Sequence, residues 1–146
     1  MDVNHMTPNR RDLLHIAGMF GALPLAAAAA DSPHPLTGAI VDEKAAAIHP
    51  YPWGEHRLYF QGTTANGRTA SAGSVWVKPG MEPHPPHQHP EEEFMVVTEG
   101  SGEISVEGKV TKVGPGSMMY CAAGKLHGIR NTGKGPLLFY FYKWKA

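Results

Sequence analysis

The sequence has little cysteine, no net charge and no long apolar run. Cys121 is the single cysteine among 146 residues, so no intramolecular disulfide can form and the fold must be held by its core. We expect this thiol to be a small buried apolar side chain rather than a reactive group. Thirteen Lys and Arg residues balance thirteen Asp and Glu residues. This even charge leaves no basic stripe and argues against a nucleic-acid partner.

Although no apolar run is long enough for a firm membrane anchor, the N-terminus has the order of an export signal. Arg10 and Arg11 precede a moderately apolar segment, Ile16 to Ala30, with small residues at its end. The segment is shorter than the roughly 20 residues that a bilayer needs, and two glycines and a proline interrupt it. Residues 1–30 resemble a twin-arginine (Tat) signal peptide. The resemblance implies export by the twin-arginine machinery, cleavage in the alanine run, and a periplasmic or extracellular protein without a stable membrane anchor.

Glycine and proline are plentiful, with 17 and 13 residues, as is typical of short strands joined by tight turns. About 116 residues remain after the leader, which is enough for one buried core but not for two. Residues 31–52 lack firm periodicity, and we expect a linker or N-terminal arm there, with a turn of helix at 42–47. We expect residues 53–146 to form one all-β domain. Its predicted strands are 57–61, 72–78, 93–98, 102–106, 110–113, 117–121, 128–131 and 137–144.

Four residues form the strongest chemical signal in the chain: His87, His89 and Glu93, with His127 following 34 residues later. Imidazole nitrogens and carboxylate oxygens suit one divalent ion of manganese, iron, nickel, copper or zinc better than calcium. A His-rich surface tract that binds metal by composition alone is the plainer interpretation. That interpretation leaves the spacing of Glu93 and His127 unexplained. His84, in the proline-rich loop, is expected to be solvated rather than a ligand.

Alternation along a strand predicts what surrounds these residues. Side chains two apart share one face, so His87 and His89 can hold one ion together, and Glu93 keeps their parity. Met95 and Val97 are then expected on the same interior face, as is Ile129 beside His127. Tyr120, Tyr140 and Trp76 are weaker candidates for the cavity wall. We place no Lys or Arg inside, and such an apolar cavity favours a small aromatic or keto-type ligand.

The same residues resemble the two motifs of the cupin superfamily, and the resemblance covers roughly Trp53 to Lys143. The first motif is a glycine, HxH, a glutamate and a glycine: Gly80, His87, His89, Glu93 and Gly100. The second motif falls on Gly116, Gly124, His127 and Asn131. Ala122 stands where the family usually has proline, and Ser117 where an acidic residue is common. The resemblance implies a small RmlC-like cupin, a double-stranded β-helix or jelly-roll barrel, whose metal ligands are His87, His89, Glu93 and His127.

Four protein ligands leave about two positions of an octahedron open for a substrate or dioxygen. The expected function is therefore a metal-dependent oxidoreductase, dioxygenase-like, acting on a small organic substrate. A non-catalytic metal or small-molecule binding protein and an isomerase or lyase are the alternatives, because the fold alone does not choose a reaction. Glu93 is the one motif residue able to act as a base, although a simple ligand role also accounts for it.

The export route bears on which metal is expected. The twin-arginine machinery carries folded proteins, so manganese or iron loaded in the cytoplasm would avoid competition from copper and zinc, which affinity alone would favour outside.

The last predicted strand bears on the oligomeric state. Residues 137–144 are apolar on both faces, so both faces are expected to be covered. A barrel strand packed on a neighbouring sheet is the plainer interpretation, and a subunit interface, hence a homodimer, is the one we favour.

Overall fold

The fold is known from a computed structural model that describes residues 36–145. The expected export signal, residues 1–30, lies outside the described residues. No helix within the described range is long and apolar enough to cross a membrane.

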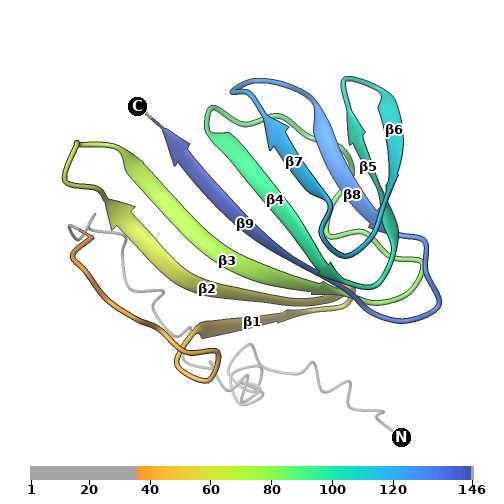
Figure 1. Cartoon of the computed structure of the whole chain (residues 1–146), viewed down its shortest axis with the longest axis horizontal. Helices are drawn as coiled ribbons and strands as arrows, with labels where there is room; N and C mark the ends of the chain where they lie inside the picture. Colours follow the sequence, from red (N-terminus) through yellow and green to blue (C-terminus); the bar gives the residue numbers. More distant parts are fainter. Residues whose placement is uncertain (1–35, 146) are drawn as a thin grey trace, which may run out of the picture. The chain divides into compact units, whose positions relative to one another are not determined.

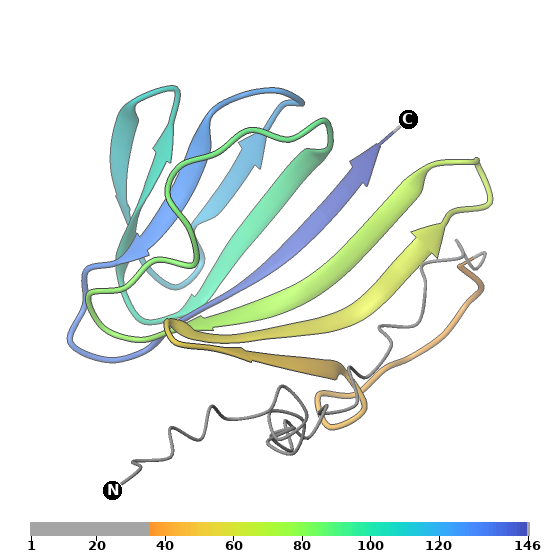
Figure 2. The same cartoon turned by 180° about the vertical axis from the view of Figure 1, so that it is seen from behind.

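Within residues 36–145, nine antiparallel strands form two sheets, which confirms the all-β prediction (Figure 1). The six-stranded sheet has the order β1-β2-β3-β9-β4-β7, and the three-stranded sheet has the order β6-β5-β8. In Figures 1 and 2 the small sheet stands beside the β4 and β7 end of the large sheet. The strands are β1 Ala47–Tyr51, β2 Gly54–Thr63, β3 Thr69–Val77, β4 Glu92–Glu99, β5 Gly102–Val106, β6 Lys109–Val113, β7 Met118–Cys121, β8 His127–Asn131 and β9 Leu137–Lys145.

The core lies between the inner faces of these sheets, and alternation selects its members. In β4 the side chains of Glu93, Met95 and Val97 are buried, while those between them are only partly covered. The expected interior face of this strand is therefore confirmed. Cys121 is also buried, as predicted, and burial raises the pKa of its thiol. The apolar core comprises Val75, Val77, Met95, Val97, Ile104, Met119, Cys121, Ile129, Leu137, Phe139 and Phe141.

Strand β9 lies in the middle of the large sheet, between β3 and β4. Its odd-numbered residues from Leu137 to Phe141 are buried, whereas Tyr142 is exposed on the outer face. Both edges of β9 are already hydrogen-bonded to neighbouring strands. The backbone edges of β9 are therefore occupied within the chain, and the homodimer stays a prediction.

The segment expected to be an arm carries a strand that the sequence did not predict. β1 pairs with β2 along its whole length, from Ala47 opposite Leu58 to Tyr51 opposite Gly54. Every residue of β1 is exposed, so the strand has no apolar alternation by which it could be recognised. The helical turn expected at 42–47 is instead an Asx-type turn, in which the Asp42 carboxylate accepts hydrogen bonds from two backbone amides that follow it.

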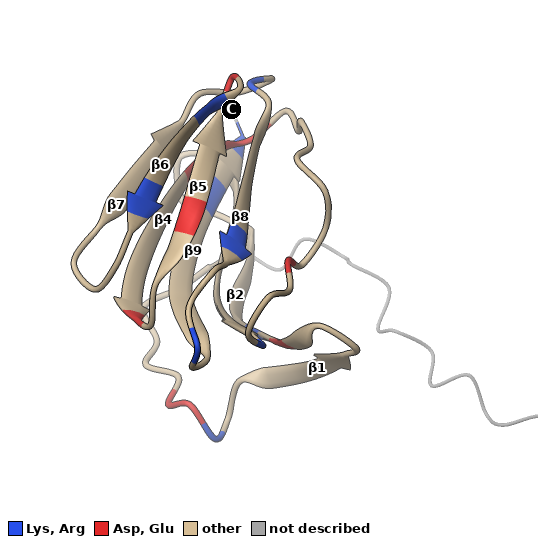
Figure 3. Cartoon of the chain, turned by 90° about the vertical axis from the view of Figure 1, so that its right-hand side faces the viewer, with Lys and Arg blue, Asp and Glu red and all other residues tan. Residues whose placement is uncertain are grey.

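The strands predicted at 102–106 and 110–113 are β5 and β6, and a tight hairpin turn joins them. Val106 pairs with Lys109, and the two residues between them, Glu107 and Gly108, have φ values of 50° and 79°. Two positive φ angles are the mark of a type I′ turn, which matches the twist of the flanking strands. On this sheet Glu103 lies opposite both Lys112 and Arg130, so charges of opposite sign alternate across it, as Figure 3 shows for β5 and β8.

Candidate metal centre

Two strands and one loop bring the predicted ligands together. Glu93 lies near the start of β4 in the large sheet, and His127 begins β8 in the small sheet. His87 and His89 come from the loop between β3 and β4, which Figure 2 shows in green running past β8. An antiparallel bridge fixes this loop, because the backbone N–H groups of His87 and His127 donate to each other's carbonyl oxygens over 2.9 and 3.0 Å.

The four side chains converge at one place. Oε2 of Glu93 lies 3.0 Å from Nε2 of His89 and 2.9 Å from Nε2 of His127. Nitrogen atoms of His87, His89 and His127 all lie within 4.8 Å of one another. Glu93 and His127 are buried and the other two are partly covered. The structure thus brings together all four residues that the spacing singled out, which lie between positions 87 and 127 of the sequence.

The backbone sets which ring nitrogen of each histidine faces the centre. Nδ1–H of His89 donates to the carbonyl oxygen of Glu91 over 3.0 Å, and Nδ1–H of His127 donates to that of Lys125 over 2.9 Å. Such bonds place the proton on Nδ1 and leave the Nε2 lone pair as the donor atom. Because Glu93 is the shared neighbour of both Nε2 atoms, its carboxylate needs a positive charge beside it, which either protons on the two imidazoles or a metal ion among the three atoms would supply.

His87, the remaining predicted ligand, also fits a metal site. Nδ1 of His87 is a buried polar atom with no hydrogen-bond partner among the described residues, and a buried ring nitrogen in that state is costly unless it is ligated. Borderline nitrogen donors with one carboxylate suit first-row divalent metals. The residues present therefore fit a divalent metal ion, which His87, His89, Glu93 and His127 would hold.

The electrostatics of the centre keep Glu93 ionised. Burial alone would raise its pKa, but the hydrogen bonds that His127 and His89 donate from Nε2 when their rings are protonated outweigh that effect and lower it. The hydrogen bond to Glu93 conversely raises the pKa of His127. Burial, with the nearby His84, His127 and His89, lowers the pKa of His87 to about 4. His87 is therefore a neutral imidazole at neutral pH, which is the form that binds metals.

Asn131, the last residue of the second motif, has a structural role instead. Its side chain is completely buried. Nδ2 donates to the carbonyl oxygens of Val77 and Gly135 over 2.8 and 2.9 Å, and Oδ1 accepts from the backbone N–H of Gly133 over 2.9 Å. The amide therefore joins the end of β8 to the end of β3 and to the turn before β9, and it does not face the four ligands.

A cavity of about 310 Å³ opens beside the centre, which is large enough for a small organic molecule. Met95 and Ile129 line it as predicted. Aromatic rings form much of the remaining wall, and the ring of His56 stacks on Phe141 with centroids 5.4 Å apart. Its lining is Tyr51, Trp53, His56, Val75, Pro83, His84, His87, Glu93, Met95, Ile129, Phe139, Phe141 and Lys143.

Three aromatic side chains named from the sequence do not reach this cavity. Tyr120 is 51% exposed, and its hydroxyl donates to Glu92 on the outer surface. Tyr140 and Trp76 have the parity opposite to the inward residues of their strands and are absent from the lining. His84, expected to be a solvated bystander, is exposed but stands at the cavity wall, its ring edge against His87 with centroids 4.0 Å apart.

Sequence reasoning missed two polar residues of the cavity. It placed no Lys or Arg inside, yet Lys143 lines the wall and pairs in register with Glu93. The signal was available, because Lys143 has the same parity as Phe139 and Phe141 in one strand. His56 carried no motif spacing, and only the position of β2 brings it to the cavity. Burial, followed by the charges of His49 and Lys143, lowers the pKa of His56.

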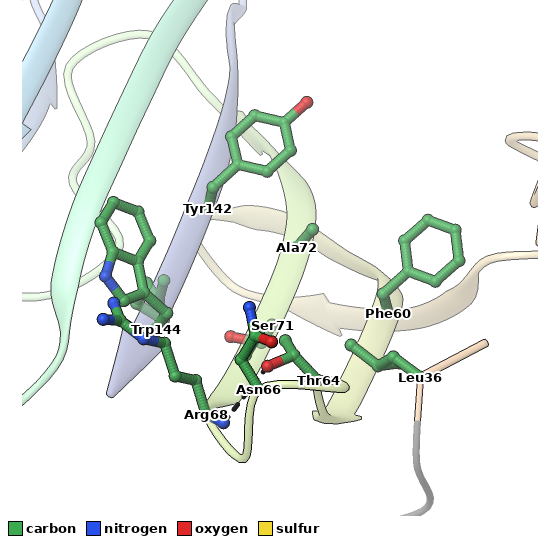
Figure 4. A pocket seen from close by; sticks show the side chains of 11 residues that line it. Leu36, Phe60, Thr64, Asn66, Arg68, Ser71, Ala72, Tyr142 and Trp144 are labelled. Carbon is green, nitrogen blue, oxygen red and sulfur yellow. Dashed lines mark hydrogen bonds between the residues drawn. The ribbon is translucent and has the colours of Figure 1, made fainter. Parts of the chain in front are cut away.

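A larger hollow of about 780 Å³ lies elsewhere, on the outer face of the six-stranded sheet (Figure 4). Phe60, Tyr142 and Trp144 line it together with Arg68. It contains none of the four predicted ligands and no histidine. This hollow is the larger of the two, but the predicted metal ligands His87 and Glu93 line the smaller cavity. We therefore take the smaller cavity as the candidate functional site.

Comparison with known proteins agrees with this fold. Residues 73–142 match the family model described as a cupin domain, a segment that includes all four predicted ligands. No curated protein matches the chain.

Several solved structures have a similar fold. An RmlC-like cupin from Shewanella frigidimarina has a TM-score of 0.64 at 15% identity, over 75% of this chain and 93% of that one. KdgF from a Halomonas species gives 0.62 at 18% identity, over 73% and 94%. A predicted oxalate decarboxylase from Thermotoga maritima gives 0.62 at 19% identity, over 74% and 100%. At these identities the likeness shows the fold alone: the described residues have the all-β, double-stranded β-helix fold of these solved structures, and residues 73–142 resemble a cupin domain.

Proposed function

We propose that this protein binds one divalent metal ion through His87, His89, Glu93 and His127 and acts as a metal-dependent oxidoreductase, of dioxygenase type, on a small organic substrate. The observation that carries the proposal is the convergence of the Nε2 atoms of His89 and His127 on one carboxylate oxygen of Glu93, each within 3.0 Å, at the wall of an aromatic cavity. The backbone carbonyl bonds to Nδ1 of His89 and His127 support it, because they fix both rings in the ligating tautomer.

A bound manganese or iron ion would supply Lewis acidity and redox chemistry at about two open positions. The chain supplies the rest. Phe139, Phe141 and Trp53 exclude water from the cavity and offer faces for an aromatic or keto-type substrate. The Glu93 carboxylate is ionised and faces the cavity, so it is the group placed to accept a substrate proton. His56 is a second acid–base group on the same wall.

The site of action is also part of the proposal. The paired Arg10 and Arg11 before a short apolar segment support export by the twin-arginine machinery to the periplasm or the exterior. Export of the folded chain would allow manganese or iron to be bound before release. Replacing both arginines by lysine should retain the precursor in the cytoplasm, which fractionation would detect. Normal export of that variant would refute this route.

Elemental analysis of the exported protein, purified without chelators, tests the metal assignment. We expect about one manganese or iron per chain, and its loss in a His87→Ala, His89→Ala variant with unchanged circular dichroism. Zinc or mixed metals would instead favour an isomerase, a lyase or a binding protein. Absence of metal from the natural protein would remove the proposed function.

A further inference from the structure

The wall of the smaller cavity also carries an ammonium group, that of Lys143. Lys143 stands directly opposite Glu93 in the pairing of β4 with β9, and residues directly opposite each other in antiparallel strands project to the same face. The ion pairs of Glu93 are with His89 and His127. Among residues 36–145, no hydrogen bond or ion pair joins Lys143 Nζ to another side chain.

The surroundings of this ammonium are aromatic. Nζ lies 5.4 Å from the centroid of the Phe141 ring, and that ring is stacked on His56. Tyr51 stacks on Trp53 with centroids 4.7 Å apart, and both line the same cavity. A partly covered ammonium in an apolar wall is costly unless an anion pairs with it. Flat rings beside it offer stacking surfaces to a flat ligand.

We propose that Lys143, with His56 as a second donor, forms a carboxylate-binding subsite, and that the substrate is a small aromatic or keto-type carboxylate. The anionic end would pair with Lys143, while the body of the ligand lies between the aromatic wall and the four-residue centre. The inference rests on the proposed function, because it concerns the substrate of that same cavity. The subsite requires the substrate to carry a negative charge, whereas the apolar lining alone would accept a neutral molecule.

A matched pair of probes tests this subsite. Benzoate and benzamide have the same shape and differ in charge, and their binding to the full metal-loaded protein can be measured by calorimetry. We expect benzoate to bind about tenfold tighter or more, as a charge-assisted hydrogen bond would give. Lys143→Met should abolish most of that preference, and Lys143→Arg should retain it. Lys145→Met removes the same charge from an exposed position of the same strand, and it should leave the preference intact.

The outcomes are separable because benzoate can also bind a metal directly. A preference that survives in Lys143→Met would come from the metal and would overturn the inference. Equal binding of the two probes, or no binding of either, by a protein that holds one metal per chain would also overturn it while leaving the proposed function in place. A protein without metal would instead remove the proposed function, and a Lys143-dependent preference there would still support the subsite. Metal content and melting temperature of each variant show whether it is folded.

Discussion

The contacts of His127 hold its ring in a single orientation, with Nε2 directed at the candidate metal centre. Its side chain is 1% exposed. Its Nδ1–H is committed to the carbonyl oxygen of Lys125, and Nε2 faces Glu93. Its backbone also forms both hydrogen bonds of the bridge to His87. No other described side chain is placed to supply a nitrogen at this position.

We therefore predict that His127→Ala lowers the metal content of the purified protein at least about tenfold, since loss of supporting residues alone typically costs 10- to 100-fold in affinity. Elemental analysis beside circular dichroism measures this. His49→Ala, which removes an exposed histidine of β1, is the matched control and should keep its metal. An unchanged metal-to-protein ratio in folded His127→Ala would refute the assignment.

Glu93→Gln tests the carboxylate separately from the histidines. Glutamine has the same shape and can still present an oxygen to the centre, but it carries no charge and cannot accept a proton. We predict that this variant retains more metal than His127→Ala and loses turnover of any substrate of the natural protein. Measurable turnover by metal-loaded Glu93→Gln would exclude Glu93 as the base and leave it a ligand only.

At the scale of elements, the turn between β4 and β5 depends on a glycine of the first motif. Gly100 has a φ of 79°, and a Cβ added there would lie 2.2 Å from the carbonyl oxygen of Pro136. Gly108, in the next hairpin, has the same φ of 79° but nothing within 4 Å of an added Cβ. Both positions are therefore strained for other residues, while only Gly100 also lacks space.

We predict that Gly100→Ala lowers the free energy of unfolding by about 3 kcal/mol or more, from backbone strain and displacement of the Pro136 segment. Gly108→Ala should cost only about 1 kcal/mol, the strain alone. Urea denaturation of the two variants measures the difference. Equal losses would mean that the chain before β9 moves aside freely and that the close contact does not constrain the turn.

Comparison of the predicted and observed strands shows which of them could be predicted from local sequence patterns. Strands β4 and β9 were predicted within a residue or two. In β4 the inward side chains alternate with partly covered ones, and β9 is a short run of apolar and aromatic residues that follows a turn. β1 was missed because all of its residues are exposed and its stability comes from backbone pairing with β2. Pairing of that kind depends on the partner strand and leaves no pattern in the sequence.

At the scale of the whole domain, the centre joins separate parts of the fold. Glu93 belongs to the six-stranded sheet, His127 to the three-stranded sheet, and His87 and His89 to the loop between β3 and β4. A metal ion held by all four would link both sheets and the loop. It would bind the folded chain far better than the unfolded one, so it should raise thermal stability.

We predict that removing the metal with a chelator lowers the melting temperature by about 10 °C, the shift expected for a stabilisation of about 2.7 kcal/mol at a hundredfold excess over Kd in a domain of this size. Scanning calorimetry with and without the chelator measures it. The His87→Ala, His89→Ala variant serves as control and should not respond. A chelator-independent melting temperature in the natural protein would show that the sheets do not depend on the metal.

The sequence by itself determined the all-β class, the inward face of β4 and the four residues of the centre. These follow from alternation and motif spacing, which are local properties of the chain. Only the tertiary structure decided that β9 lies inside the sheet, that Nε2 rather than Nδ1 of His89 and His127 faces Glu93, and that Lys143 and His56 share one cavity. Strand order, ring orientation and cavity lining depend on contacts between residues far apart in the chain, and no local pattern encodes them.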